Sequence, residues 1–288
     1  MLRRFIKKAF YVGYLYSGYV PLRDLVLWLF GRSWVVVLNY HSVGGCDAVT
    51  KPLEAFHRDM AYLHRTYCRI GFSALRDRLQ SGAPIRRRYR AVTFDDGYRD
   101  NLTHALPVLK HYRVPATFFA ATGFIGAARA FPYEVETAAA DADGAAAPLV
   151  RPSLTWADLR AMQTDGFEIG SHTVNHVNLG RATIETTRAE LEESLAALNR
   201  ELGERPRAFA FPWGKPGDFS AAAMDEVRRA GYYAAATACG GVNTRAGDLY
   251  NIRRIDVGNG RLGWLEVRVR MAGLDPDHVR RRWRALAG

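Results

Sequence analysis

Two groups of polar residues in this sequence have the types and spacing needed for hydrolytic chemistry. Asp95 and Asp96 precede Gly97, and His172 and His176 stand four residues apart in the run Ser-His-Thr-Val-Asn-His. Two neutral imidazoles and one carboxylate fill three positions around a divalent cation and leave others open for water and substrate. The two histidines can converge on one ion if the segment forms a helical turn. This ligand set is typical of a catalytic metal site rather than a structural one.

Each pattern alone also occurs without catalysis. Asp-Asp-Gly is common in turns, and His-x-x-x-His is found on the faces of ordinary helices. Here, however, Asp95 directly follows the apolar run 91–94, and His172 follows the apolar run 167–170 within two residues. Catalytic side chains of α/β barrels lie at the carboxyl ends of the strands. The shared position favours one joint site.

The elements that must position these residues are short apolar runs, which alternate with helical patterns from residue 34 onward. Repeated strand–helix–strand units form right-handed crossovers and a parallel sheet covered by helices. About seven such units in roughly 250 residues favour a closed barrel over an open sheet. The predicted strands cover residues 34–38, 91–94, 116–120, 167–170, 208–211, 232–236 and 252–257.

Several helix boundaries can be read between these strands. Pro52 is expected to open a helix, and Thr155 with Asp158 makes a capping-box pattern at the start of another. Gly203 should end a leucine-rich helix, and Ser220 should cap the helix that follows. These boundaries support the alternation of strands and helices.

The chain of 288 residues is predicted to hold two parts. Residues 1–32 form an N-terminal amphipathic segment, and residues 33–288 form the barrel. Within the barrel, residues 127–150 are rich in Ala and Asp with little periodicity. We expect a loop insertion there, either disordered or acting as a lid over a site.

The amino terminus superficially resembles a signal peptide. Basic residues precede the apolar, tyrosine-rich stretch 9–20, and a second apolar run covers 25–30. No small-x-small cleavage site closes the first stretch, and Arg23 with Asp24 interrupts the only candidate spanning helix. Tyrosine, tryptophan and flanking basic residues are the composition of an element in the membrane interface. The alternative is a pair of amphipathic helices packed on the domain.

Three motifs carry a resemblance to a known family. Thr-Phe-Asp-Asp-Gly at 93–97, Ser-His-Thr-Val-Asn-His at 171–176 and Phe-Pro-Trp-Gly at 211–214 resemble the first three motifs of the polysaccharide deacetylases. These are carbohydrate esterase family 4, with the nodulation-type deacetylase fold, and the resemblance runs from about residue 36 to 257. It implies a deformed (β/α)7 barrel of parallel strands with outer helices. The implied activity is metal-dependent removal of an acyl group from an N-acylated sugar.

The resemblance also implies roles for individual residues. By position in the motifs, Asp95 is the general base, while Asp96, His172 and His176 hold a divalent metal. We expect Zn²⁺, with Co²⁺ or Ni²⁺ as alternatives. The backbone N–H of the tryptophan in the third motif would donate to the oxyanion. The candidates for substrate or oxyanion contact are Trp213, Pro212 and Tyr98.

The sequence departs from the commonest family pattern in two places. The third motif usually begins with Arg, whereas the chain has Ala-Phe-Ala-Phe at 208–211, and the usual late Leu-x-His is absent because the last segment offers only His278. His41, after the first predicted strand, resembles the acid histidine of a circularly permuted branch that includes the poly-N-acetylglucosamine deacetylases. We therefore expect His41 to be the general acid and Arg254 to replace the missing Arg beside Asp95. A core or turn histidine is the alternative for His41.

Charge narrows the partners. The chain has 40 Lys or Arg against 29 Asp or Glu, a net charge of +11, with clusters of arginine at 86–88, 253–254 and 280–282. Nucleic acid, anionic lipid and phosphorylated glycans are candidate partners of such a surface, but no nucleic-acid-binding motif is present. We expect an N-acetylated glycan as substrate, an anionic membrane surface as a further partner, and no nucleic acid.

Three scattered cysteines without a Cys-x-x-Cys pair fit a reducing compartment. We expect a cytoplasmic location, or a peripheral one on the inner face of the membrane, with export through an uncleaved N-terminal segment as the alternative. The substrate is then a polysaccharide or a membrane-linked glycan precursor. Two other functions stay open at this stage. One is hydrolysis of another non-peptide C–N bond, such as that of a cyclic imide, and the other is binding of membrane or nucleic acid without catalysis.

Overall fold

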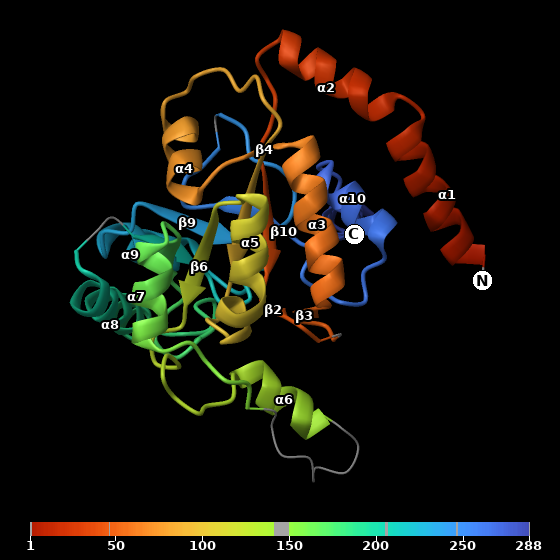
Figure 1. Cartoon of the computed structure of the whole chain (residues 1–288). Coiled ribbons are helices and arrows are strands. Elements are labelled where there is room, and N and C mark those ends of the chain that lie inside the picture. The colour runs from red at the N-terminus through yellow and green to blue at the C-terminus, as the bar shows by residue number, and fades with distance from the viewer. Residues whose placement is uncertain (1, 46, 141–149, 205–206, 246, 288) are drawn as a thin grey trace.

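The centre of the molecule is a parallel sheet that closes on itself. The computed structural model describes residues 2–45, 47–140, 150–204, 207–245 and 247–287 (Figure 1). Eight strands follow the order β1-β10-β9-β8-β7-β6-β5-β4, and β1 also pairs with β5. Seven strands therefore form a closed barrel, with β4 added beside β5. The strands are β1 (Val36–Tyr40), β4 (Cys68–Arg69), β5 (Tyr89–Phe94), β6 (Ala116–Ala120), β7 (Glu168–Ser171), β8 (Ala208–Ala210), β9 (Ala234–Thr237) and β10 (Ile252–Asp256).

The barrel strands coincide with the seven predicted runs, shifted by a few residues at their ends. The register between β1 and β5 places Val36 opposite Arg90 and Tyr40 opposite Phe94, so both strands end at the same edge. The predicted deformed (β/α)7 barrel of parallel strands with outer helices is confirmed. A short pair of strands, β2 (Ser42–Val43) and β3 (Thr50–Lys51), lies outside the barrel.

Helices surround the barrel (Figure 1). The predicted capping box is present, with Thr155 and Asp158 at the start of one helix. Ser220 caps the helix that begins at Ala221, also as predicted. Helices α4 and α10 had no clear sequence signal. The helices of the barrel are α3 (Leu53–Thr66), α4 (Phe72–Gln80), the π-helix η1 (Asn101–Ala105) with α5 (Leu106–Tyr112), α7 (Trp156–Thr164), α8 (Ile184–Leu202), α9 (Ala221–Arg229), α10 (Trp264–Met271) and α11 (Pro276–Ala287).

Side chains alternate between two apolar clusters along each strand. Val36 and Leu38 belong to one cluster, and Val37 belongs to the other together with alanines of β5, β8 and β9. A strand buried on both faces is continuously apolar, which explains why these runs lack a polar alternation. The guanidinium of Arg254, a residue that is 2% exposed, lies over the ring of Phe119 of this second cluster, 5.5 Å from its centroid.

The first residues form two helices outside the barrel, α1 (Leu2–Tyr16) and α2 (Tyr19–Leu29). Helix α1 lies against α10, and α2 extends beyond one end of the barrel (Figure 1). Among the described residues, neither these helices nor any other is both long and apolar enough to cross a bilayer. The division of the chain at residue 32 stays a prediction.

The predicted loop insertion at 127–150 differs from the structure in part. Helix α6 (Pro132–Ala140) occupies its middle, while residues 141–149 lie outside the described residues. Phe131, just before the helix, stacks on Phe124 with ring centroids 4.1 Å apart. The start of helix α6 is therefore anchored by an aromatic contact with a residue outside the helix. Such a contact leaves no apolar periodicity in the sequence of the helix itself, so the helix was not predicted.

Candidate active site

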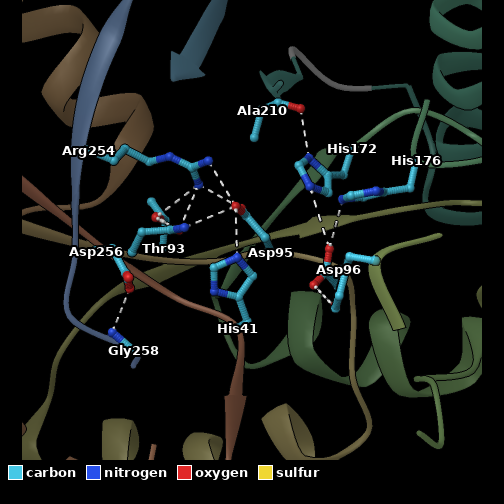
Figure 2. Close-up of polar contacts among 12 residues, drawn as sticks. His41, Thr93, Asp95, Asp96, His172, His176, Ala210, Arg254, Asp256 and Gly258 are labelled. Carbon is cyan, nitrogen blue, oxygen red and sulfur yellow. Dashed lines mark hydrogen bonds and ion pairs between the residues drawn. The ribbon is translucent and has the colours of Figure 1, made fainter. Parts of the chain in front are cut away.

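The predicted site residues gather at the carboxyl end of the barrel. Asp95 and Asp96 follow β5, His172 follows β7, and His41 follows β1 (Figure 2). They surround a cavity of about 360 Å³. Its lining comprises Asn39, His41, Ala48, Val49, Asp95, Asp96, Tyr133, His172, His176, Trp213, Lys215, Ala238, Asp256 and Asn259.

Asp96, His172 and His176 form a cluster with the geometry of a metal site. One ligand atom from each lies within 4.8 Å of the others. The Oδ1 atom of Asp96 is 3.6 Å from His172 Nε2 and 3.4 Å from His176 Nε2. His172 Nδ1 donates to the carbonyl of Ala210 at 2.7 Å, and this bond leaves the Nε2 lone pair directed at the cluster. Burial is the largest influence on the pKa of Asp96, which it raises, and on that of His176, which it lowers.

The histidines converge although the segment between them is not a helical turn, the condition that their spacing suggested. Residues 172–176 follow β7 as an irregular loop, in which Thr173 and His176 have φ of 66° and 54°. Asp96 and Trp213 also have positive φ, so four of the five such non-glycine residues in the described chain belong to this site. Left-handed backbone at non-glycine residues is strained, and such strain is concentrated at functional sites. The loop therefore needs external support.

Glu190 of α8 supplies that support, and the sequence analysis did not identify it. Its Oε2 accepts hydrogen bonds from the backbone N–H groups of Val174 and Asn175, both at 2.8 Å. Its Oε1 accepts from Asn175 Nδ2 at 2.7 Å. The side chain is 7% exposed. In the sequence, Glu190 is one of several acidic residues of a polar helix. Nothing in that pattern links it to the loop that carries the histidines.

Asp95 is held by Arg254, which lies where the sequence analysis expected it (Figure 2). Arg254 Nη1 donates to Asp95 Oδ1 at 2.6 Å, and Nη2 donates to Oδ2 at 2.8 Å. Asn39 Nδ2 donates to Asp95 Oδ2 at 3.1 Å, and its own Oδ1 accepts from Arg254 at 2.8 Å. Burial is the largest single influence and raises the pKa of Asp95, but the charge and hydrogen bonds of Arg254, together with the nearby His172 and His41, outweigh it and hold that pKa well below its usual range. Asn39 could have been found, because it is a polar residue inside the apolar run that precedes His41.

His41 lines the cavity on the other side of Asp95. Its Nε2 atom is 3.9 Å from Asp95 Oδ2, and its side chain is 26% exposed. The alternative histidine, His278, bonds through Nδ1 to the carbonyl of Cys239 and does not line the cavity. The structure thus brings His41, and not His278, to the predicted base.

The three candidates for substrate or oxyanion contact have different places. Trp213 lines the cavity, with its ring centroid 4.5 Å from that of His176. Pro212 is buried beside it and does not line the cavity. Tyr98 is 1% exposed and does not line the cavity. Its hydroxyl contacts the hydroxyl of Tyr133 and donates to the carboxylate of Glu134. A contact of Tyr98 with substrate stays a prediction.

Tyr133 of helix α6 occupies the position that was expected for Tyr98. Its hydroxyl donates to Asp96 Oδ2 at 2.9 Å, on the carboxylate oxygen that faces away from the histidines. Arg151 Nε bonds Glu134 Oε1 at 2.9 Å, and Arg151 Nη2 bonds Asp47 Oδ2 at 2.8 Å, so α6 is tied to the β2–β3 loop. The segment 127–150 therefore contributes a wall of the cavity.

Comparison with known proteins agrees with this geometry. The family model of the polysaccharide deacetylases matches residues 83–235. The Bacillus subtilis (strain 168) protein YxkH, whose name describes a polysaccharide deacetylase, is 24% identical over 232 residues, which are 79% of this chain and 72% of YxkH.

Solved structures share the fold. The Streptococcus pyogenes deacetylase PplD in complex with acetate has 21% identity and a TM-score of 0.64, over 79% of this chain and 94% of PplD. IcaB from Ammonifex degensii has 23% identity and a TM-score of 0.66, over 78% of this chain and 92% of IcaB. At these identities the likeness shows the fold alone.

Proposed function

The chain belongs to the polysaccharide deacetylase family, and from this premise we propose that it is a hydrolase that removes the N-acetyl group of an amino sugar in a glycan. One observation carries the proposal. A cluster of Asp96, His172 and His176 shares one cavity with a carboxylate, Asp95, that is paired to Arg254. An assembly of metal ligands beside an ionised base has the parts needed to hydrolyse an amide.

The described residues fit a divalent cation. Asp96 Oδ1 and His176 Nδ1 are buried without a hydrogen-bond partner in the described part of the chain, and the orphaned carboxylate oxygen faces two imidazole nitrogens. A buried anionic oxygen without a donor is costly unless a cation is bound. We propose Zn²⁺, with Co²⁺ or Ni²⁺ as alternatives, because imidazole and carboxylate suit these ions. Such an ion, when bound, polarises the amide carbonyl and lowers the pKa of water.

The protein's own groups supply the proton transfers. Asp95 accepts the proton of the attacking water, and Arg254 keeps this carboxylate ionised by holding its pKa low. His41 donates a proton to the departing amine nitrogen. It can do so because its Nε2 faces the cavity near Asp95. The backbone N–H of Trp213 is proposed to donate to the oxyanion, and its ring to pack against a sugar face.

The shape of the cavity favours a glycan substrate. At about 360 Å³ it has the size of a pocket for one sugar unit and its acetyl group. Lys215, Asp256 and Asn259 add polar groups to the lining. We propose a polysaccharide or a membrane-linked glycan precursor as substrate, and a cytoplasmic or inner-membrane-associated location. The relation to the circularly permuted branch is part of the same proposal, because His41 follows the first strand of the barrel.

The test is release of acetate by metal-loaded protein from a panel of N-acetylhexosamine polymers, oligomers and lipid-linked precursors. Asp95→Asn should retain the metal and lose at least about a hundredfold in rate. Asp96→Ala should lose the metal itself, measured by metal analysis after dialysis. Normal turnover by Asp95→Asn would refute the assigned base. Turnover of a cyclic imide without turnover of any acetylated sugar would replace the proposed substrate class.

His41→Ala tests the acid, and His278→Ala is its matched control. We expect His41→Ala to bind metal normally and to lose about 10²–10⁴-fold in rate, as removal of a general acid does. His278→Ala should keep both properties because His278 lies outside the cavity lining. Full activity of His41→Ala would return the proton donation to solvent or to another group.

A further inference from the structure

The exposed apolar surface of this protein is concentrated in its first two helices. Twelve of the sixteen large hydrophobic side chains that are exposed in the described chain belong to residues 5–30. Soluble monomers rarely expose a contiguous apolar patch of this kind without a use for it. The outer apolar face, as we call it, comprises Phe5, Ile6, Phe10, Val12, Tyr16, Tyr19, Leu22, Leu25, Val26, Trp28, Leu29 and Phe30.

Helix α1 exposes large apolar side chains together with two cations, Lys7 and Lys8. Phe5 and Phe10 are 72% and 58% exposed, whereas Tyr11 is 4% exposed against the barrel. Lys7 pairs with Glu266 of α10 at 2.7 Å. A helix that merely packs on a soluble domain turns its apolar stripe to the core, whereas five large apolar side chains of α1 are exposed along with its two described lysines, as in a helix that lies in a membrane interface.

Helix α2 separates its charged and apolar side chains more completely than α1 does. Arg23 and Asp24 are its only charged residues, and both point to the protein, where they pair at 2.6 Å. Arg23 also donates to the carbonyl of Ala272 at 3.0 Å, and Asp24 pairs with Arg88 at 3.3 Å. The outward side of α2 is left without a charged group among the described residues.

A basic cleft lies directly beside this face. It has a volume of about 510 Å³, and its walls combine Leu25 and Trp28 of α2 with four arginines. Asp24 is the only acidic residue in its lining, and it is already paired. Arginine recognises phosphate through a planar fork of donors. The four arginines of the cleft are Arg65, Arg86, Arg87 and Arg88.

We propose that the outer apolar face lies in the interface of an anionic phospholipid bilayer, with lipid phosphates seated in the basic cleft. The proposal adds a binding surface to the enzyme and does not depend on the catalytic assignment. An apolar stripe bordered by cationic groups matches both layers of such an interface, acyl chains and anionic headgroups.

The charge of this surface favours a bilayer over a second copy of the chain. Two copies joined through the outer apolar face would bring two arginine clefts together in a protein whose net charge is +11, and like charges would then oppose association. Anionic headgroups would instead neutralise the arginines.

The experiment is co-sedimentation of the full chain with vesicles of phosphatidylcholine, with and without phosphatidylglycerol. We expect binding to the anionic vesicles that weakens with added salt. Arg86→Gln with Arg87→Gln should weaken it by about five-fold for each charge removed. The matched control is Arg160→Gln with Arg200→Gln, two exposed arginines on α7 and α8, which should bind as the unchanged protein does.

The apolar part is tested with Leu22→Ser and Leu29→Ser, which are 62% and 56% exposed and can change without opening the core. This variant should lose binding to both vesicle types while its acetate release from a soluble oligomer stays unchanged. The proposal would be overturned if the double arginine variant and the double leucine variant both bound anionic vesicles as tightly as the unchanged chain does. It would also be overturned if the unchanged chain did not bind these vesicles. A dimer in solution that the two serines dissociate would overturn it as well, because a second copy would then be the occupant.

Discussion

Replacing Arg254 by Met isolates the strongest electrostatic contact of the site. Arg254 and Asp95 are 2% and 3% exposed, and two hydrogen bonds of 2.6 and 2.8 Å join them. Removing one partner of a buried pair leaves an uncompensated charge and costs about 3–5 kcal/mol of folding free energy. For a domain of this size each kcal/mol corresponds to about 2–4 °C in Tm. Arg254→Met should therefore melt about 6–20 °C below the unchanged protein.

A double-mutant cycle separates this pair from general damage to the core. Asp95→Asn alone leaves Arg254 without its partner, whereas the double variant Arg254→Met with Asp95→Asn removes both charges. We expect the double variant to recover at least about 2 kcal/mol relative to the sum of the single changes. The assay is chemical denaturation at pH 7 in the presence of a chelator, so that metal binding does not contribute. The reasoning would be refuted if the losses in unfolding free energy of the two single variants simply added up in the double variant. A Tm of Arg254→Met within about 2 °C of that of the unchanged protein would also refute it.

The same pair predicts a pH dependence with a defined sign. The folded-state pKa of Asp95 is held below its unfolded value, so the stabilisation by the pair is fully present above about pH 4 and is lost as the pH falls. In Arg254→Met, burial without the guanidinium raises that pKa instead. The gap in stability between the two proteins should therefore narrow below about pH 4. A gap that is constant between pH 7 and pH 3 would contradict this account.

Two further changes test the groups that position the metal ligands. Tyr133→Phe removes the hydroxyl that donates to Asp96. It should weaken metal affinity by about 10–100-fold, as loss of a hydrogen bond to a metal ligand does, and leave the Tm nearly unchanged. A competition titration with a chromophoric chelator measures the affinity. Glu190→Ala leaves three donors of the loop before His176 without their acceptor, so it should lower metal affinity by a similar factor and also destabilise the fold by about 1–3 kcal/mol. Unchanged affinity in both variants would show that Asp96 and His176 are placed by the backbone alone.

Strand positions and the two motifs were predictable from sequence because both are local. An apolar run marks a buried strand, and Asp96 and His172 stand within two residues of a strand end. The partners that fix the site come from far along the chain. Tyr133 and Glu190 contact the site from helices α6 and α8, which are distant from the two motifs in sequence. The spacing of residues along the chain therefore could not predict these contacts.

The histidine loop shows the limit of a spacing argument. The spacing of four residues from His172 to His176 fits a helical turn, yet the two imidazoles converge through a loop with positive φ at Thr173 and His176. Backbone strain is decided by what surrounds the loop, and that information is tertiary. Burial is likewise tertiary information, and the sequence did not show that Tyr98 would lie outside the cavity lining.

The two ends of strand β5 carry different chemistry. Arg86, Arg87 and Arg88 precede the strand and Asp95 and Asp96 follow it, and the strand has six residues, which span about 20 Å. In Figure 1, α2 lies at one end of the barrel, and α6, β2 and β3 lie at the other. Electrostatic effects of lipid headgroups decay within about 8 Å at physiological ionic strength. Lipid phosphates seated at the arginines would thus lie too far from the carboxylates at the other end of the strand to shift their charge, so that binding to a membrane and hydrolysis could proceed independently.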